Sequence, residues 1–168
     1  GVFGGGNNDT INGNDGNDTL FGDGGNDLIH GGKHDDKITG GTGDDKVYGD
    51  SGNDIVYGDA GNDYMNGGTG FDTLDFSNAG AALTVDLSKH TISGAATGND
   101  LVYNFETLIA SGFADSIKGS KYAETIIGGG GDDTIRSLGG ADVLTGGTGN
   151  DTFAFFKKDV MSGSQHLG

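Results

Sequence analysis

The chain contains no cysteine, no proline and no tryptophan, and only 32% of its 168 residues are hydrophobic. The lack of cysteine excludes disulfide cross-links and thiolate metal sites, which leaves oxygen atoms as the plausible ligands for a metal. The small hydrophobic fraction disfavours a conventional core between layers of helices and sheets. We therefore expect a single domain that depends on something besides apolar burial for its stability.

Positive charge is also scarce. Nine Lys and Arg residues stand against 25 Asp and Glu residues, which gives a formal net charge of −16. Such an acidic chain should repel nucleic acid and anionic lipid, so we predict neither nucleic-acid binding nor membrane insertion. Only Glu106 and Glu124 are glutamate. Because aspartate favours turns over helices, we expect the carboxylates in loops, with a cation as the missing partner.

Signals for targeting and for catalysis are absent from the sequence. No apolar run reaches transmembrane length, and no N-terminal signal peptide is recognisable at Gly1, so we interpret the chain as part of a larger protein. Motifs of zinc proteases, serine hydrolases, phosphate-binding loops and EF-hands do not occur. We therefore predict that this segment is not itself an enzyme.

Glycine is abundant, with 37 residues, and it follows a strict period. From Gly4 to Asp75 the pattern Gly-x-x-Gly-x-Asp-x-apolar-x repeats eight times without insertion or deletion. The sixth position is always aspartate, namely Asp9, Asp18, Asp27, Asp36, Asp45, Asp54, Asp63 and Asp72. The eighth position is always apolar, namely Ile11, Leu20, Ile29, Ile38, Val47, Val56, Met65 and Leu74.

Each repeat reads as a tight turn followed by a short strand. The fourth position is glycine except for Asn7 and His34, which are residue types that tolerate positive φ, and the second position behaves similarly. This predicts a left-handed backbone at both positions. The last three residues alternate outward, inward, outward, with the apolar eighth position inside. The sequence thus predicts an all-β fold, a parallel β-roll (β-solenoid) with two nonapeptide repeats per turn.

Stacking of such coils would place the aspartates in two files on opposite sides of the roll. Strand spacing separates neighbouring carboxylates in a file by roughly 5 Å at the backbone, so that they repel one another. One buried apolar residue per repeat contributes roughly 1.5 to 3 kcal/mol, which is less than the cost of ordering nine backbone residues. Both files therefore need neutralisation.

The repeat resembles the nonapeptide Gly-Gly-x-Gly-x-Asp-x-U-x, with U apolar, of RTX (repeats-in-toxin) proteins. Residues 40–48, Gly-Gly-Thr-Gly-Asp-Asp-Lys-Val-Tyr, match it at every defined position, and the resemblance covers about three quarters of the chain. It implies a hemolysin-type calcium-binding β-roll, with several Ca²⁺ ions between stacked turns. Calcium suits this role because it accepts six to eight oxygen ligands in tolerant geometry, and we expect about six ions in the first run.

The same resemblance implies the ligands. They are the side chains of the eight sixth-position aspartates and backbone carbonyls of the turns, for which we take Gly13, Gly16, Gly22, Gly25, Gly31, Gly40, Gly43, Gly49, Gly52, Gly58, Gly61, Gly67 and Gly70. Residues 4–75 are thus predicted to be the regular calcium-binding part.

The remainder of the chain is less regular. We interpret residues 76–109 as a stretch of the same solenoid with longer, calcium-free turns and strands near 83–87 and 105–109. Residues 110–154 carry five degenerate repeats with Asp115, Glu124, Asp133, Asp142 and Asp151 at the sixth position, and Ile117, Ile126, Ile135, Leu144 and Phe153 at the eighth. We predict one good site between Asp133 and Asp151, further ligands at Asp115 and Asp142, and little binding at Glu124. Residues 155–168 would be a cap or the start of another segment.

For function, the resemblance implies a module of a bacterial protein exported by a type I secretion apparatus, which folds on binding calcium outside the cell. We expect it to be secreted and monomeric, and to meet the apparatus only transiently. The alternative is a calcium-rigidified adhesion or polysaccharide-binding module. An acidic polysaccharide is then the possible partner, contacted by Lys33, Lys37 and Lys46 with the nearby rings of Phe21, Tyr48 and Tyr57.

Overall fold

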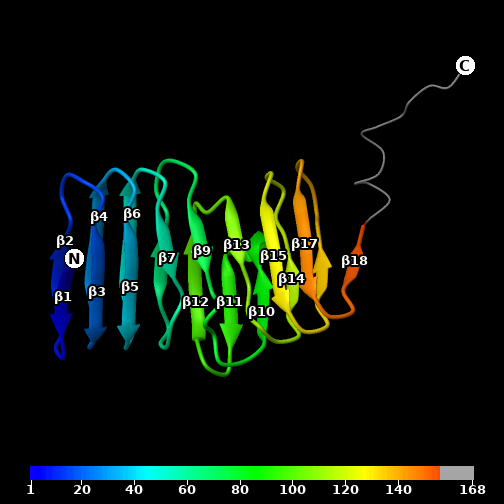
Figure 1. The fold of residues 1–168 in the computed structure, drawn as a ribbon, viewed down its shortest axis with the longest axis horizontal. Helices are drawn as coiled ribbons and strands as arrows, with labels where there is room; N and C mark the ends of the chain where they lie inside the picture. The colour runs from blue at the N-terminus through cyan, green and yellow to red at the C-terminus, as the bar shows by residue number, and fades with distance from the viewer. Residues whose placement is uncertain (156–168) are drawn as a thin grey trace, which may run out of the picture.

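The computed structural model describes residues 1–155, which form two sheets wound into one elongated roll (Figure 1). One sheet has eight strands, in spatial order β1 (Val2–Gly5), β3 (Thr19–Gly24), β5 (Lys37–Thr42), β7 (Ile55–Tyr57), β9 (Thr73–Asp75), β13 (Thr107–Ile109), β15 (Thr125–Gly130) and β17 (Val143–Thr148). The other has ten, in order β2 (Thr10–Asn12), β4 (Leu28–Lys33), β6 (Lys46–Ser51), β8 (Tyr64–Asn66), β12 (Gly98–Tyr103), β11 (Thr91–Gly94), β10 (Leu83–Asp86), β14 (Ser116–Lys118), β16 (Thr134–Arg136) and β18 (Thr152–Ala154).

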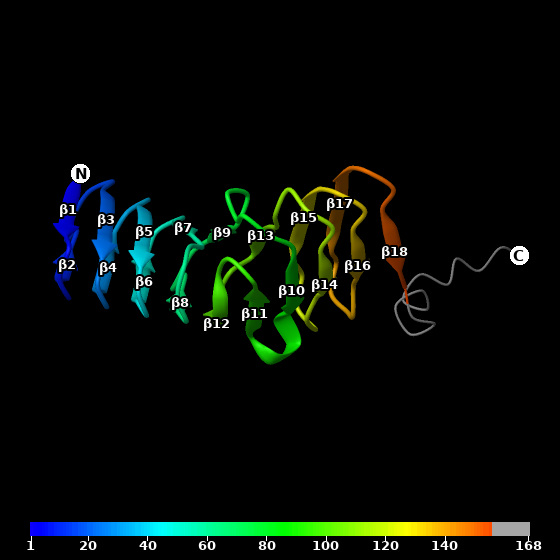
Figure 2. The ribbon, with the colours of Figure 1, turned by 90° about the horizontal axis from the view of Figure 1, so that it is seen from below.

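The two sheets face each other along the whole roll, as the view from below shows (Figure 2). The register confirms the predicted parallel β-roll with two repeats per turn. Leu20 of β3 pairs with Ile38 of β5, and Ile38 pairs with Val56 of β7, so that each coil advances the chain by two nonapeptides. Odd and even repeats therefore occupy different sheets.

The core is a double file of eighth-position side chains between the sheets. All eight of the first run are at most 5% exposed, as predicted, and Ile117, Ile126 and Ile135 continue the file. Leu144 is only partly buried. Phe153 pairs in register with the fully buried Ile135 and so continues the file, but it is 38% exposed because β18 is the last strand of the described roll.

The turns have the predicted left-handed residues, with two exceptions. At the fourth position the six glycines of the first run and His34 (φ 75°) have positive φ, whereas Asn7 does not. Asn7 lies in the first turn, which has no preceding coil in the described chain to stack against. At the second position Asn14, Asp23 and Asp50 have φ between 71° and 72°, and the glycines are also left-handed, but Asp59 is not.

The interruption is not a simple continuation of the solenoid. β10 and β11 pair antiparallel, as do β11 and β12, with a short 3₁₀ helix, η1 (Leu87–Lys89), after β10. β12 then resumes parallel pairing with β8, and β10 pairs parallel with β14. In the other sheet β9 pairs directly with β13. The insertion thus adds two strands to one sheet only, and Figure 2 shows its loop projecting below the roll.

At the C-terminal end, β18 pairs with β16 and Phe155 is 61% exposed. Most of the predicted cap, residues 156–168, lies outside the described residues. Among residues 1–155 no helix is long and apolar enough to cross a membrane.

Candidate metal centres

The sixth-position aspartates are linked by a ladder of hydrogen bonds. The backbone N–H of each donates to Oδ1 of the aspartate one coil further on, at 2.7 Å from Asp9 to Asp27 and 2.8 Å from Asp27 to Asp45 and from Asp45 to Asp63. On the opposite side the same bond joins Asp18, Asp36, Asp54 and Asp72 in turn. The structure therefore brings together both predicted files, and Oδ1 fixes the orientation of each bonded carboxylate.

The second carboxylate oxygen of these residues has no partner. Oδ2 is buried without a hydrogen bond in Asp9, Asp27, Asp36, Asp45, Asp54, Asp63 and Asp72. From Asp27 to Asp72 the residues themselves are at most 3% exposed. Leaving a buried carboxylate oxygen unsatisfied is costly, about 1 to 3 kcal/mol for one group and more when charged. Rows of such atoms fit cations bound between successive turns, which would satisfy these oxygens.

The electrostatics of the files point the same way. Burial, opposed by the N–H bond and reinforced by neighbouring carboxylates, raises the pKa of Asp45 to about 6 and that of Asp54 to about 7. Burial also raises the pKa of Asp36, Asp63 and Asp72. These five carboxylates thus resist ionisation, and a cation beside them would reverse this effect.

The glycines of the turn leave space for an ion. A Cβ on Gly31 would approach Asp36 Oδ2 and the Gly49 carbonyl oxygen to 2.6 Å each, and a Cβ on Gly22 would overlap Asp27 Oδ2 and the Gly40 carbonyl. Carboxylate and carbonyl oxygens therefore converge beside the first glycine, which is the hard donor set that calcium prefers. Beside the first glycine of a neighbouring turn lie the carbonyls of Gly22, Gly31, Gly40, Gly49 and Gly67. The carbonyls of Gly25, Gly43, Gly52 and Gly61 face the fourth-position glycine of a neighbouring turn.

The remaining predicted glycines do not show a carbonyl oxygen facing a neighbouring turn in the same way. Ligand roles for Gly13, Gly16 and Gly70 stay predictions. Gly58 differs from the other first-position glycines, because a Cβ there would overlap the ring of Phe76, which is fully buried where the chain leaves the regular roll.

Two acidic residues of the insertion join the files although they were not predicted as ligands. Asp100 is 1% exposed, its Oδ1 accepts the N–H of Asp63 at 3.1 Å, and its Oδ2 is buried without a partner. Burial raises the pKa of Asp100 to about 7. Glu106 Oε2 accepts the N–H of Asp72 at 2.8 Å. The sequence does contain a pattern that indicates Asp100 as a ligand, because Gly98, Asp100 and Val102 have the spacing of the fourth, sixth and eighth positions of a repeat.

In the second run the structure brings the predicted pair together. Asp133 Oδ1 accepts the N–H of Asp115 at 2.8 Å, and its Oδ2 is buried without a partner. Asp133 in turn donates its N–H to Asp151 Oδ1 at 3.1 Å. A Cβ on Gly128 would approach the Gly146 carbonyl to 2.5 Å and overlap Asp133 Oδ2, as in the first run. This site has the same donor set as the regular ones.

The other three acidic residues of the second run, Asp115, Glu124 and Asp142, each accept hydrogen bonds from a serine. The Ser111 hydroxyl donates to both carboxylate oxygens of Asp115 at 2.7 and 2.9 Å, and its N–H to Oδ2 at 2.8 Å. The N–H of Ser120 lies 3.0 Å from both oxygens of Glu124. Asp142 Oδ2 accepts a bond from the Ser137 hydroxyl. This geometry disfavours the predicted ligand roles of Asp115 and Asp142, because protein donors hold the oxygens that an ion would need.

Comparison with known families agrees with this geometry. The family model described as "RTX calcium-binding nonapeptide repeat (4 copies)" matches residues 3–38, 39–74 and 118–153, which is more than half of the chain. The chain belongs to the RTX calcium-binding repeat family. A search of curated proteins finds no match.

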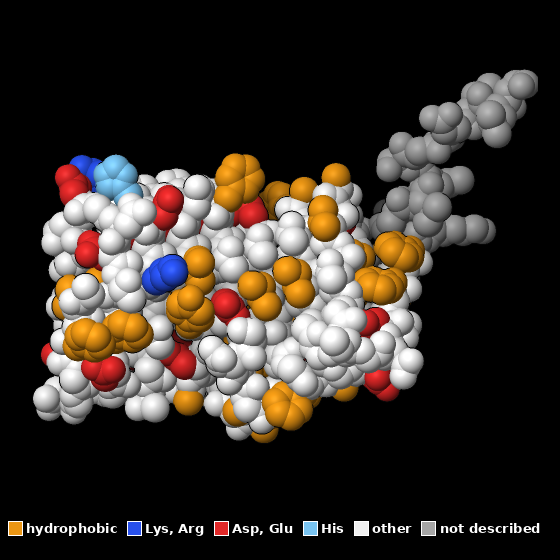
Figure 3. All heavy atoms as spheres, in the orientation of Figure 1, with side chains coloured by type: hydrophobic (Ala, Val, Ile, Leu, Met, Phe, Trp, Pro, Cys, Tyr) orange, Lys and Arg blue, Asp and Glu red, His pale blue; other side chains and the backbone are white. Residues whose placement is uncertain are grey.

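Two features of this RTX roll bear on partners. The lysines and rings predicted to contact a polysaccharide do not form one cluster, since Lys46 and Tyr48 lie on β6 whereas Lys37 and Tyr57 lie on strands of the other sheet. Lys33 is paired with Asp15 at 2.9 Å. Acidic side chains are spread over the face shown in Figure 3 and do not gather in one patch.

Proposed function

We propose that this RTX segment is a calcium-triggered folding module, in which Ca²⁺ bound between stacked turns holds the roll together. The observation that carries the proposal is the row of buried, unpartnered Oδ2 atoms along both aspartate files. With calcium these atoms are ligands, so that binding energy becomes folding energy. Without calcium the aspartate files repel, and one core side chain per repeat contributes too little to hold the coils together.

The proposed setting is secretion. In a calcium-poor cytosol the acidic chain stays unfolded, a state suited to passage through a type I secretion apparatus. Outside the cell, calcium near the millimolar range matches the weak class of extracellular calcium sites, and the roll folds. The folded module then stabilises the protein of which it is part. We infer no catalytic role for the segment.

Circular dichroism of metal-free protein during calcium titration tests this proposal. The expected result is little β signal in chelator and a cooperative rise to a β spectrum with added calcium, while magnesium has little effect because it requires stricter geometry and gives up water reluctantly. A β spectrum that is complete in chelator and indifferent to calcium would contradict the proposal.

Glycan binding is a second candidate, favoured by a row of neighbouring rings, partly stacked and partly tilted, on the ten-stranded sheet and the turn beside it. Ring centroids lie 4.7 Å apart for His30 and Tyr48, 5.5 Å for Tyr48 and Tyr64, 5.4 Å for Tyr64 and Tyr103, and 4.6 Å for Tyr103 and His90. Lys46 pairs in register with Tyr64 and is exposed. Such a row can stack on sugar rings, and the lysine suits an acidic polysaccharide.

Retention on an immobilised polyuronate, in saturating calcium, tests this candidate. Tyr48→Ala combined with Tyr64→Ala should weaken retention, whereas Tyr57→Ala on the other sheet serves as the matched control. Equal retention of all three proteins would exclude the row of rings as a binding surface.

A further inference from the structure

Asp59 departs from the pattern of the regular turns. It occupies the second position of its repeat, where the other seven residues of the first run have positive φ, but its own φ is not positive. Its turn borders the insertion, because Phe76 fills the space beside Gly58. Asp59 also lines a cavity together with Asn78 and Thr97. The Asp59 backbone therefore lacks the left-handed conformation of the other second-position residues, and its side chain points in a different direction.

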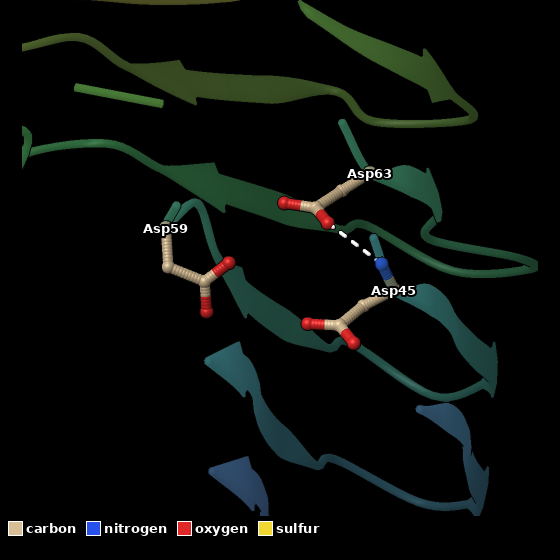
Figure 4. Close-up of side chains that lie close together, drawn as sticks. All are labelled: Asp45, Asp59 and Asp63. Carbon is tan, nitrogen blue, oxygen red and sulfur yellow. Dashed lines mark hydrogen bonds between the residues drawn. The ribbon is translucent and has the colours of Figure 1, made fainter. Parts of the chain in front are cut away.

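The Asp59 carboxylate turns toward the aspartate file. Its Oδ2 accepts the N–H of Gly41 in the neighbouring turn at 2.5 Å. One carboxylate oxygen from each of Asp45, Asp59 and Asp63 can be chosen so that all three lie within 4.8 Å of one another. In Figure 4 the Asp59 carboxylate lies opposite the Asp45 and Asp63 carboxylates, and all three side chains point into the space between them. At this step of the file, three carboxylates converge.

Two of these carboxylates have an oxygen without a partner. Asp45 and Asp63 are 2% and 3% exposed, and their Oδ2 atoms are buried with no hydrogen bond. Burial and the charges of Asp63 and Asp45 also raise the pKa of Asp59, although its bond from Gly41 opposes this. Two buried carboxylates with free oxygens and a half-buried third one therefore favour a hard cation close to all of them.

We propose that Asp59 is a third carboxylate ligand of the calcium ion between Asp45 and Asp63, and that this site is the tightest of the roll. The inference rests on the proposed function, and it adds a ligand that the repeat pattern does not require. At the other steps of the first run the files supply two carboxylates per ion. Affinity of calcium sites rises with the number of charged ligands, so this ion binds first as calcium increases. It thereby fixes the coil that borders the insertion.

Calorimetric titration of the full chain with calcium, starting from metal-free protein, tests this inference. Asp59→Asn keeps an oxygen acceptor for Gly41 and removes the charge. Asp23→Asn is the matched control, because Asp23 occupies the same second position but is exposed and left-handed. We expect Asp59→Asn to raise the dissociation constant of the tightest site about tenfold, and Asp23→Asn to leave it unchanged.

The charge also predicts opposite effects with and without calcium. In chelator, Asp59→Asn relieves repulsion, so its β signal should equal or exceed that of the natural chain, while its calcium midpoint is higher. Both variants should reach the same spectrum in saturating calcium. If the natural chain binds calcium but Asp59→Asn titrates identically, or fails to fold at saturation, this inference is wrong and the proposed function stands. If the natural chain binds no calcium, the proposed function fails as well.

Discussion

The backbone N–H of Asp63 donates to Oδ1 of Asp100, which lies 37 residues further along the chain. The same bond joins Asp45 to Asp63 over 18 residues. The aspartate file thus crosses the point where the chain makes its insertion, and a carboxylate that lies outside the regular repeats takes the next place in it.

Replacing Asp100 should therefore affect calcium-induced folding as strongly as replacing a regular aspartate. Asp100→Ala removes the oxygen that orients toward Asp63 and the unpartnered Oδ2, so we expect the calcium midpoint of the β signal to rise by a similar factor as for Asp45→Ala. Circular dichroism during calcium titration measures this. Asn99→Ala is the control, because Asn99 is exposed and contributes its backbone N–H to Asn62. Equal midpoints for Asp100→Ala and Asn99→Ala would contradict the prediction.

Stability without calcium should fall as pH rises. In the folded roll the pKa is raised from 3.8 to about 6 for Asp45 and to about 7 for Asp54 and Asp100. Between these values the folded state binds more protons than the unfolded state, so the contribution is fully present below about pH 4 and is lost as pH rises toward about 7. In chelator the residual β signal measured by circular dichroism should be larger at about pH 5 than at about pH 7.5.

Calcium should invert this dependence. The ion needs ionised carboxylates, so its binding releases protons and its affinity falls as pH decreases from about 7 to 5. Thermal unfolding of the same samples in saturating and limiting calcium measures the effect. A metal-free β signal that rises with pH would contradict the assignment of these aspartates as buried, proton-binding groups.

The serine bonds of the second run should stabilise it independently of calcium. Ser111 is 1% exposed and provides two donors to the buried Asp115. Ser111→Ala leaves the N–H but removes the hydroxyl, so we expect the free energy of unfolding to fall by about 1 to 3 kcal/mol in saturating calcium. Urea unfolding measures it, with the exposed Ser116→Ala as control. A loss that disappears at high calcium would show that an ion can replace the hydroxyl.

The narrow core between the two sheets predicts a contrast between two apolar residues. Ile38 is fully buried between the sheets, and Ile38→Ala should cost about 2 to 5 kcal/mol of unfolding free energy. Phe153 is 38% exposed at the last described strand, so Phe153→Ala should cost much less. Urea unfolding in saturating calcium compares them. A larger loss for Phe153→Ala would mean that the end of the roll is covered in solution.

The nine-residue period was sufficient to predict the regular half of the molecule. A spacing that alternates turn and strand determines which side chains are inside, and Ile38 and Asp45 lie where the pattern requires. The same logic could have found Asp100, but the 37-residue step from Asp63 is not a multiple of nine, so the repeat does not align with those before it. The antiparallel pairing of β10 and β11 has no periodic signal at all.

The sequence could not predict residues whose role depends on a neighbour that is far away in the chain. Asp59 has the same place in its repeat as Asp23, and the packing of Phe76 beside Gly58 sets its turn apart in the folded chain. Likewise, Ser111 replaces a leading glycine, which suggests a weakened calcium turn, but the bond from its hydroxyl to Asp115 depends on the rotamers of both side chains. The nine-residue period predicts where each residue lies in the roll. Which side chains contact one another can be read only from the folded structure.

The insertion also has a consequence for cooperativity. Elsewhere each coil follows the previous one after 18 residues, so that folding can spread by closing one short loop at a time. β9 and β13 are neighbours in their sheet, yet β10, β11 and β12 lie between them in the chain, so that pairing them closes a longer loop. We therefore expect folding to slow at the insertion. The coils before the insertion and the coils after it should fold as two units that pair with each other late.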